Sequence, residues 1–180
     1  MANRLPSSIL PHGQKRGLHG WGRSNQKEKY RATSFRRLSP KIHGMYWMIK
    51  YLLDTHIFLW SLLDPSYLSK NVANELDNPE NELWLSPITT WEVVVLSEKG
   101  RIQLDAPPIS WVKNVFNILP FHEATLNHEV AMESRNIRLP HQDPADRFIA
   151  ASASVYGLTL VTADRKLITG ASAYSVFANE

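Results

Sequence analysis

Apolar residues along the chain are grouped in a way that predicts short buried strands separated by helices. Runs of apolar residues bounded by polar or turn residues predict strands at 49–53, 82–86, 118–121, 158–162 and 174–177. Apolar residues at helical spacing, with start and stop signals around them, predict helices at 55–63, 69–76, 89–99, 109–117, 123–136 and 144–156. Because strands that alternate with helices are joined by crossover connections, the pattern predicts an α/β fold with a mainly parallel sheet covered on both faces.

Helix-terminating residues support this division. Gly100 and Gly157 follow two predicted helices at the position where a left-handed residue commonly ends a helix. Pro144 suits the first turn of the helix 144–156, and Asp143 before it suits the N-terminal cap.

Residues 1–47 have a different character from the rest of the chain. They contain ten Lys and Arg against one acidic residue, are rich in Gly, Ser and Pro, and show no apolar period. We therefore predict a disordered basic N-terminal extension, followed by a single domain at 48–180. The extension is interpreted either as an arm that contacts nucleic-acid phosphates or as residues translated upstream of a start at Met48, and we favour the second interpretation.

Composition excludes several classes of protein. The chain has no cysteine, so disulfides and thiolate metal sites are ruled out, and any metal would be held by oxygen or imidazole. No apolar run approaches the roughly 20 residues of a membrane-spanning helix, and no secretory signal is evident. We expect a cytoplasmic protein that does not associate with membranes.

Four acidic residues stand at positions that suggest a common site. Asp54 and Asp164 come directly after predicted strands, and ligand sites of open α/β sheets lie at the carboxyl ends of the strands. Glu92 lies among apolar neighbours in a predicted helix, and Asp146 lies in the first turn of another. Converging carboxylates repel one another unless a divalent cation lies between them. Oxygen ligands suit Mg²⁺ or Mn²⁺, which can activate water against a phosphodiester, so the pattern favours metal-dependent hydrolysis of nucleic acid.

Each of these residues also has an ordinary structural interpretation. Asp54 could only cap a helix, Asp164 could be a turn residue, and Glu92 could lie on an exposed helix face. Asp143 and Asp146 compete for one role: Asp143 fits the helix cap, so we assign the ligand role to Asp146 and leave Asp143 as a supporting carboxylate.

Histidines and tryptophans are less informative. His122 and His128 lie six residues apart and miss the spacing of a helical zinc pair. His56 and His141 lie near the acidic residues and could orient a phosphate or a water, but ordinary packing is the stronger interpretation. Five tryptophans could stack on bases, although their intervals favour positions in the core or at an interface: Trp47, Trp60, Trp84, Trp91 and Trp111.

Four segments together resemble the motifs of a known family. They are Leu52-Leu53-Asp54-Thr55-His56, Ser86-x-x-Thr89-x-Trp91-Glu92, Asp143-Pro144-Ala145-Asp146-Arg147-Phe148-Ile149-Ala150-Ala151 and Leu160-Val161-Thr162-Ala163-Asp164. In this order and approximate spacing they resemble PIN-domain ribonucleases, specifically the VapC-type toxins of bacterial toxin–antitoxin pairs. The resemblance extends from Met48 to about Phe177.

The resemblance implies a PIN-like three-layer α/β/α sandwich and an enzyme that cleaves RNA. It also implies that Asp54, Glu92 and Asp146 bind catalytic Mg²⁺ or Mn²⁺, while Asp164 completes the acidic pocket with help from Thr162. It further implies a homodimer that a cognate VapB-type antitoxin inhibits by covering the site with its C-terminal segment.

Two other functions are weighed against this one. A phosphatase of the haloacid dehalogenase type would need a second Asp two residues after the first, where this chain has His56. A catalytically inactive PIN-fold module that binds RNA or regulates a partner would be marked by a missing acidic position, and none is missing.

Overall fold

The computed structural model describes residues 48–180, and the predicted N-terminal extension lies outside these residues. The strands of the described part are β1 (Lys50–Leu53), β2 (Glu82–Leu85), β3 (His122–Glu123), β4 (Thr159–Thr162) and β5 (Ser175–Ala178). The helices are α2 (Thr55–Leu63), α3 (Lys70–Leu76), α4 (Pro87–Glu98), α5 (Pro108–Ile118), α6 (His128–Asn136), α7 (Pro144–Tyr156) and α8 (Arg165–Thr169), with a 3₁₀ turn η1 (Pro65–Tyr67) after α2. None of these helices is long and apolar enough to cross a bilayer.

The strands form one sheet in the order β3-β2-β1-β4-β5, and every neighbouring pair is parallel. Leu52 in the central strand β1 pairs in register with Trp84 of β2 and Leu160 of β4. The predicted parallel sheet is confirmed.

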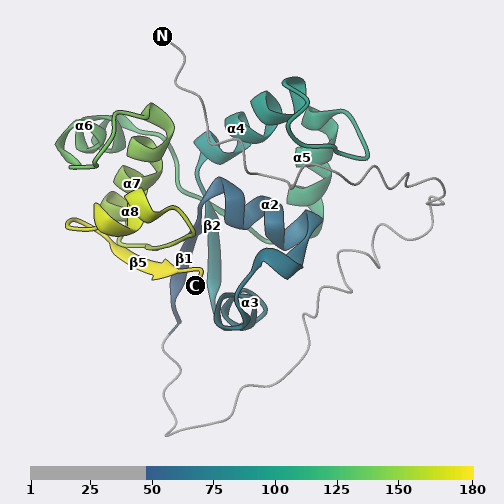
Figure 1. Cartoon of the computed structure of the whole chain (residues 1–180), viewed down its shortest axis with the longest axis horizontal. Coiled ribbons are helices and arrows are strands. Elements are labelled where there is room, and N and C mark those ends of the chain that lie inside the picture. Colours follow the sequence, from purple (N-terminus) through teal and green to yellow (C-terminus); the bar gives the residue numbers. More distant parts are fainter. Residues whose placement is uncertain (1–47) are drawn as a thin grey trace, which may run out of the picture.

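Alternating side chains of β1 divide the core into two halves. Tyr51 and Leu53 face a cluster formed with α2, α3, α4 and α5, whereas Leu52 faces a cluster formed with α6, α7 and α8. Figure 1 shows α6, α7 and α8 on one side of the sheet and α2, α3 and α5 on the other. The predicted three-layer α/β/α sandwich is therefore confirmed.

Two element predictions were wrong in detail, and one helix was missed. The strand predicted at 118–121 is displaced to β3, because Pro120 lacks the N–H that a strand donates to its neighbour and Ile118 still belongs to α5. The helix predicted from 123 begins only after Asn127, whose side chain accepts a hydrogen bond from the N–H of Val130 (2.9 Å). Helix α8 was not predicted, since five residues are too few to show a helical period.

The helix ends follow the predicted signals. Gly157 ends α7 with φ of +61° and Gly100 follows α4 with φ of +64°, a conformation that side chains with a Cβ adopt at a cost. Asp143 caps α7 by accepting a hydrogen bond from the N–H of Ala145 (3.0 Å).

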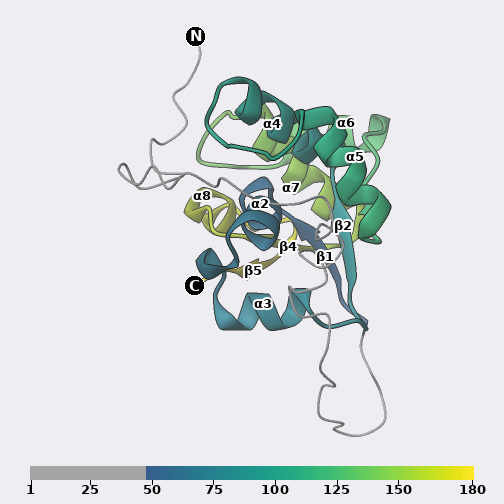
Figure 2. The same ribbon diagram turned by 90° about the vertical axis from the view of Figure 1, so that its right-hand side faces the viewer.

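The strand order places a topological switch point between β1 and β4. From β1 the chain adds β2 and then β3 on one side, and it then crosses to the other side of β1 for β4 and β5. Figure 2 shows β1, β2 and β4 in the middle of the molecule. Ligands of open α/β sheets bind beyond the carboxyl ends of the strands at such a point, so the residues after Leu53 and Thr162 are the first to consider.

Candidate active site

Asp54 is the most firmly held carboxylate at this switch point. It comes directly after β1, caps α2, and is only 3% exposed. Its Oδ1 accepts a hydrogen bond from the N–H of Thr55 (2.6 Å), and its Oδ2 accepts one from Oγ1 of Thr162 (2.8 Å). Both oxygens are therefore fixed in direction, although a carboxylate can accept further interactions at each of them. The capping role weighed from the sequence is confirmed, and Asp54 follows β1 directly as the sequence predicted.

Thr162 links the ends of the two central strands. Its buried hydroxyl donates to Asp54 and accepts a hydrogen bond from the N–H of Asp164 (3.0 Å). Asp164 itself caps α8, because its Oδ1 accepts from the N–H of Lys166 (2.7 Å). Asp164 thus has a structural role as a helix cap, and its backbone is linked to Asp54 through the hydroxyl of Thr162.

Glu92 reaches the same region from α4. It is partly buried, and its Oε2 accepts a hydrogen bond from Oγ1 of Thr55 (2.5 Å). Burial raises the pKa of Glu92, and the charges of Asp54 and Asp143 add to this increase. No role for Thr55 was predicted from the sequence, although its position directly after Asp54, at the start of a helix, was a signal for one.

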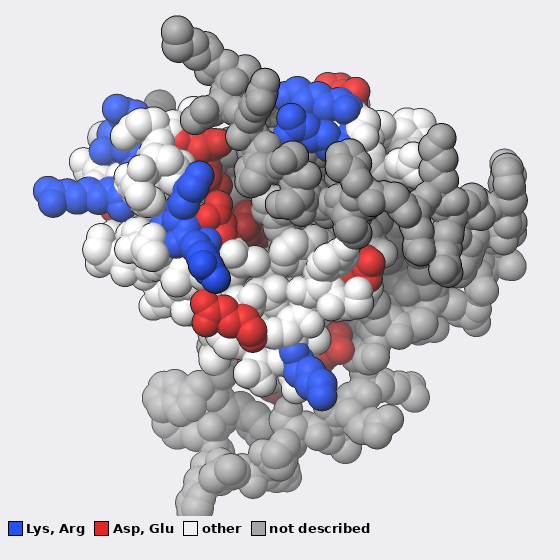
Figure 3. Space-filling view, viewed as in Figure 1, with Lys and Arg blue, Asp and Glu red and all other residues white. Residues whose placement is uncertain are grey.

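Asp146 lies among the other carboxylates. Its pKa is raised to about 8, first by burial and then by the negative charges of Asp54, Asp143, Asp164 and Glu92. The structure therefore brings these carboxylates into one strongly negative region. Figure 3 shows acidic side chains gathered on the face between α2 and the α7–α8 side, with Lys and Arg side chains next to them.

Comparison with known proteins gives this region a family context. Residues 51–171 match the model of the PIN domain. The chain is 34% identical over 123 residues to Ribonuclease VapC22 of Mycobacterium tuberculosis, a match that covers 67% of this chain and 91% of that protein. The chain belongs to the PIN-domain family.

Solved structures share the fold of this PIN domain. A chain of the DNA-bound VapBC structure from Salmonella typhimurium matches with a TM-score of 0.55 and 19% identity, covering 73% of this chain and 98% of that one. A chain of FitAcB from Neisseria gonorrhoeae matches with a TM-score of 0.54 and 25% identity, covering 72% and 97%. The predicted PIN-like fold is thereby confirmed.

Two histidines border the acidic region of the PIN domain. Nδ1 of His56 lies 3.8 Å from Oδ2 of Asp54, and this interaction, supported by the charges of Glu92 and Asp146, outweighs burial and raises the pKa of His56 to about 9. His56 is therefore a cation at neutral pH and offsets part of the negative charge.

His141 is oriented by a backbone group. Its Nδ1 accepts a hydrogen bond from the N–H of Asp143 (3.1 Å), so in the neutral ring Nε2 carries the proton. Nε2 lies 3.4 Å from Oδ2 of Asp146, within ion-pair distance but without hydrogen-bond geometry. His141 thus faces Asp146 from the loop before α7.

The donor atoms of the PIN-domain site suit a hard divalent cation. Within residues 48–180 no three His, Asp or Glu side chains form a ready-made metal site. The available donors are carboxylate oxygens, which Mg²⁺ and Mn²⁺ prefer. Burial and then the neighbouring negative charges raise the pKa of Asp146, and a bound cation would offset both effects. The residues fit such an ion in their chemistry.

A cavity in the described part of the chain lies away from these carboxylates. It has a volume of about 770 Å³ and is lined by residues that precede or begin β2 and β3, among them Glu82, Leu83 and Phe121. These residues lie at the amino ends of the strands, whereas the carboxylates lie at the carboxyl ends. The cavity is therefore separate from the acidic site.

Replacing Thr162 by Val is expected to lower the free energy of unfolding by about 1–3 kcal/mol. The change removes the hydroxyl between Asp54 and Asp164 and leaves the N–H of Asp164 without its partner. Urea denaturation would measure the loss. The matched control is Thr169→Val, whose exposed hydroxyl has only a 3.4 Å contact with a helix carbonyl. Equal stability of the two variants would contradict the bridging role.

Proposed function

We propose that this PIN domain is a metal-dependent endoribonuclease and the toxin of a toxin–antitoxin pair. The observation that carries the proposal is Asp54, buried at the switch point and fixed by two hydrogen bonds, in a region that holds four further carboxylates. The similarity to Ribonuclease VapC22 supports RNA as the substrate.

In this proposal Asp54, Glu92 and Asp146 hold Mg²⁺ or Mn²⁺, and Asp164 supports the metal or a water. When bound, such an ion lowers the pKa of a water and neutralises charge that develops on a phosphodiester. Thr162 and Thr55 keep the Asp54 and Glu92 carboxylates in place through the hydrogen bonds described above.

Two titratable groups of the site complement this assignment. Asp146, with its pKa near 8, binds a proton at neutral pH when no cation is close, so metal binding there displaces a proton. The His56 cation, with 35% of its side chain exposed, lies where a substrate phosphate can approach it.

The proposed partner is a VapB-type antitoxin. The structures that share this fold come from complexes named VapBC and FitAcB. We infer that an antitoxin segment covers the acidic site, that the protein forms a homodimer, and that it acts in the cytoplasm. Size-exclusion chromatography with light scattering would test the dimer.

Incubation of the purified protein with end-labelled structured RNAs tests the activity. Parallel reactions contain Mg²⁺, Mn²⁺ or a chelator, and we expect discrete internal cleavage products only with a metal. Cleavage that persists in chelator would contradict the metal dependence. RNA binding without cleavage in either metal would contradict the enzyme and favour the inactive regulatory module.

A further inference from the structure

An aromatic pair close to the acidic site has no part in the proposed chemistry. The rings of Trp60 on α2 and Tyr67 on η1 are stacked, with centroids 5.5 Å apart and planes inclined by 26°. One turn earlier on α2 the ring of His56 lies 5.8 Å from that of Trp60, and His56 in turn lies beside Asp54. A continuous row of rings therefore leads from Asp54 to Tyr67.

Asn179 fixes this pair relative to the site. Its Nδ2 donates a hydrogen bond to the carbonyl oxygen of Tyr67 (2.9 Å), and its Oδ1 accepts one from the N–H of Ser69 (2.6 Å). The backbone N–H of Asn179 donates to the carbonyl oxygen of Thr162 (2.9 Å). The residue that holds η1 is thus also bonded to the strand end that holds Asp54. Because Trp60 in addition packs against the core, the pair is rigid before any ligand arrives.

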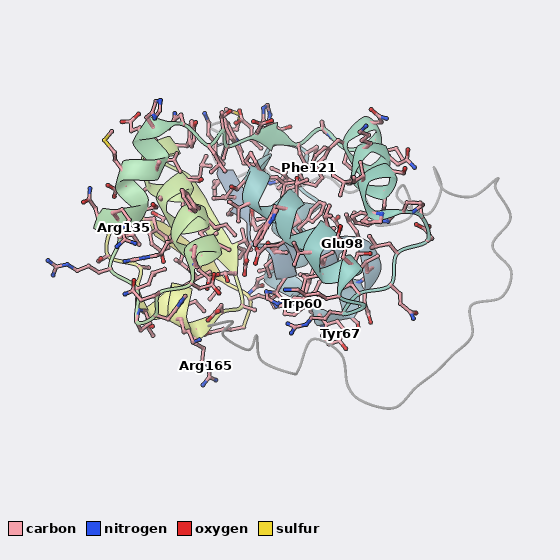
Figure 4. The ribbon with its side chains drawn as sticks, turned by 90° about the horizontal axis from the view of Figure 1, so that it is seen from above. Trp60, Tyr67, Glu98, Phe121, Arg135 and Arg165 are labelled. Atoms are coloured by element: carbon pink, nitrogen blue, oxygen red, sulfur yellow. The ribbon has the colours of Figure 1, made fainter. Side chains whose placement is uncertain are left out.

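The charge of the domain makes such a pair useful for RNA binding. Residues 48–180 carry 10 basic and 16 acidic side chains, so attraction to phosphates contributes less than it does in a basic protein. The basic residues Arg165 and Lys166 of α8 are exposed next to the acidic region. The ring of Tyr67 on η1 is accessible as well, since the residue is 37% exposed. Figure 4 shows Trp60 and Tyr67 next to each other, with Arg165 extending from the same side of the molecule. Stacking on aromatic rings depends little on charge and accepts any base.

We propose that Trp60 and Tyr67 form a platform on which an unpaired base of the RNA substrate stacks, next to the phosphate that is cleaved. The inference rests on the proposed ribonuclease activity and assigns substrate binding to two residues outside the acidic cluster. A base inside a duplex is already stacked and paired, so it is not available to the platform.

Binding is tested in an Asp54→Asn background, where RNA is not consumed. The probe is a fluorescently labelled single-stranded RNA of roughly twelve nucleotides, and the same sequence as a duplex, at one fixed salt and Mg²⁺ concentration. Tyr67→Leu and Trp60→Leu are each expected to weaken binding of the single strand about tenfold, while Tyr67→Phe retains it. The matched control is Phe116→Leu, an exposed aromatic residue on α5, for which no change is expected.

Several results would overturn the platform. Tyr67→Leu could bind the single strand as tightly as Tyr67→Phe, or it could lose affinity for single strand and duplex equally. With Asp54 intact, the variants could also keep the KM for RNA while a purified antitoxin no longer inhibits cleavage, which would make the pair a protein-docking site. If Trp60→Leu unfolds, Tyr67→Leu alone tests the loss of stacking, and Trp60→Phe, which keeps a ring and most of the buried volume, is expected to retain binding.

Kinetics with Asp54 intact separate this inference from the proposed function. The platform predicts a raised KM for single-stranded RNA with little change in kcat in Tyr67→Leu. An unchanged KM in an active enzyme would contradict the platform alone. Absence of cleavage by the unsubstituted chain would contradict the ribonuclease proposal, whatever the binding measurements show.

Discussion

Replacement of Asp54 by Asn is expected to lower the rate of RNA cleavage by roughly 10³-fold without unfolding the protein. The amide has the shape of the carboxylate, and its oxygen can still accept the hydrogen bond from the N–H of Thr55. Its NH₂ group can donate to the hydroxyl of Thr162, so the buried contact between β1 and β4 survives. What is lost is the negative charge toward a divalent cation. Single-turnover cleavage of labelled RNA measures the rate, and circular dichroism measures the fold.

The matched control for this variant is Asp105→Asn. Asp105 is exposed in the connection between α4 and α5, so the same change of charge is made away from the acidic region. We expect the control to cleave at the rate of the unsubstituted protein. An Asp54→Asn protein with undiminished metal-dependent activity would remove the basis of the proposed mechanism.

In chelating buffer the melting temperature is expected to fall as the pH rises from about 4 to about 9. The pKa of Asp146 rises from an ordinary value of 3.8 to about 8 in the folded protein, and that of His56 rises from 6.5 to about 9. Between each pair of values the folded state binds more protons than the unfolded state, so the free energy of unfolding decreases as the pH increases. For both groups, stability that is fully present below the ordinary pKa is lost as the pH passes the raised one.

Added Mg²⁺ or Mn²⁺ should reverse most of this loss, and more so at pH 8 than at pH 5. A cation can take the place of the proton on Asp146, and a ligand that binds only the folded state raises its stability. Asp146→Asn should flatten the pH dependence in chelator and weaken the response to metal. Differential scanning calorimetry with and without chelator measures both effects. A melting temperature that rises with pH in chelator, or a slope unchanged in Asp146→Asn, would contradict the crowding of carboxylates.

The acidic residues could be identified from the sequence because each has a distinctive local position. Asp54 and Asp164 were selected because they follow strands, and Glu92 because a charge among apolar neighbours needs a partner. The order of capping positions separated Asp143 from Asp146, and the structure has Asp143 as the cap and Asp146 in the first turn. The assignment of ligands among them stays a prediction.

Contacts that the sequence did not reveal connect residues far apart in the chain. Thr55 and Glu92 are joined by one hydrogen bond, and Asn179 of the C-terminal segment bonds to Tyr67 and Ser69. The positions of the short elements β3 and α8 were also not predicted. The extent of β3 depends on its pairing with β2, and that of α8 depends on the cap by Asp164, so neither shows a local period.

The sequence by itself determined the layers of this protein and the residues able to carry its chemistry, because side-chain periodicity and strand-to-helix transitions are local properties. The tertiary structure alone decided that Asp54 is buried between β1 and β4, that carboxylates from three other segments surround it, and that an aromatic pair is fixed nearby. These features depend on the strand order and on hydrogen bonds between residues far apart in the sequence. They also depend on the electrostatic field of several buried charges together. None of these can be read from a local sequence pattern.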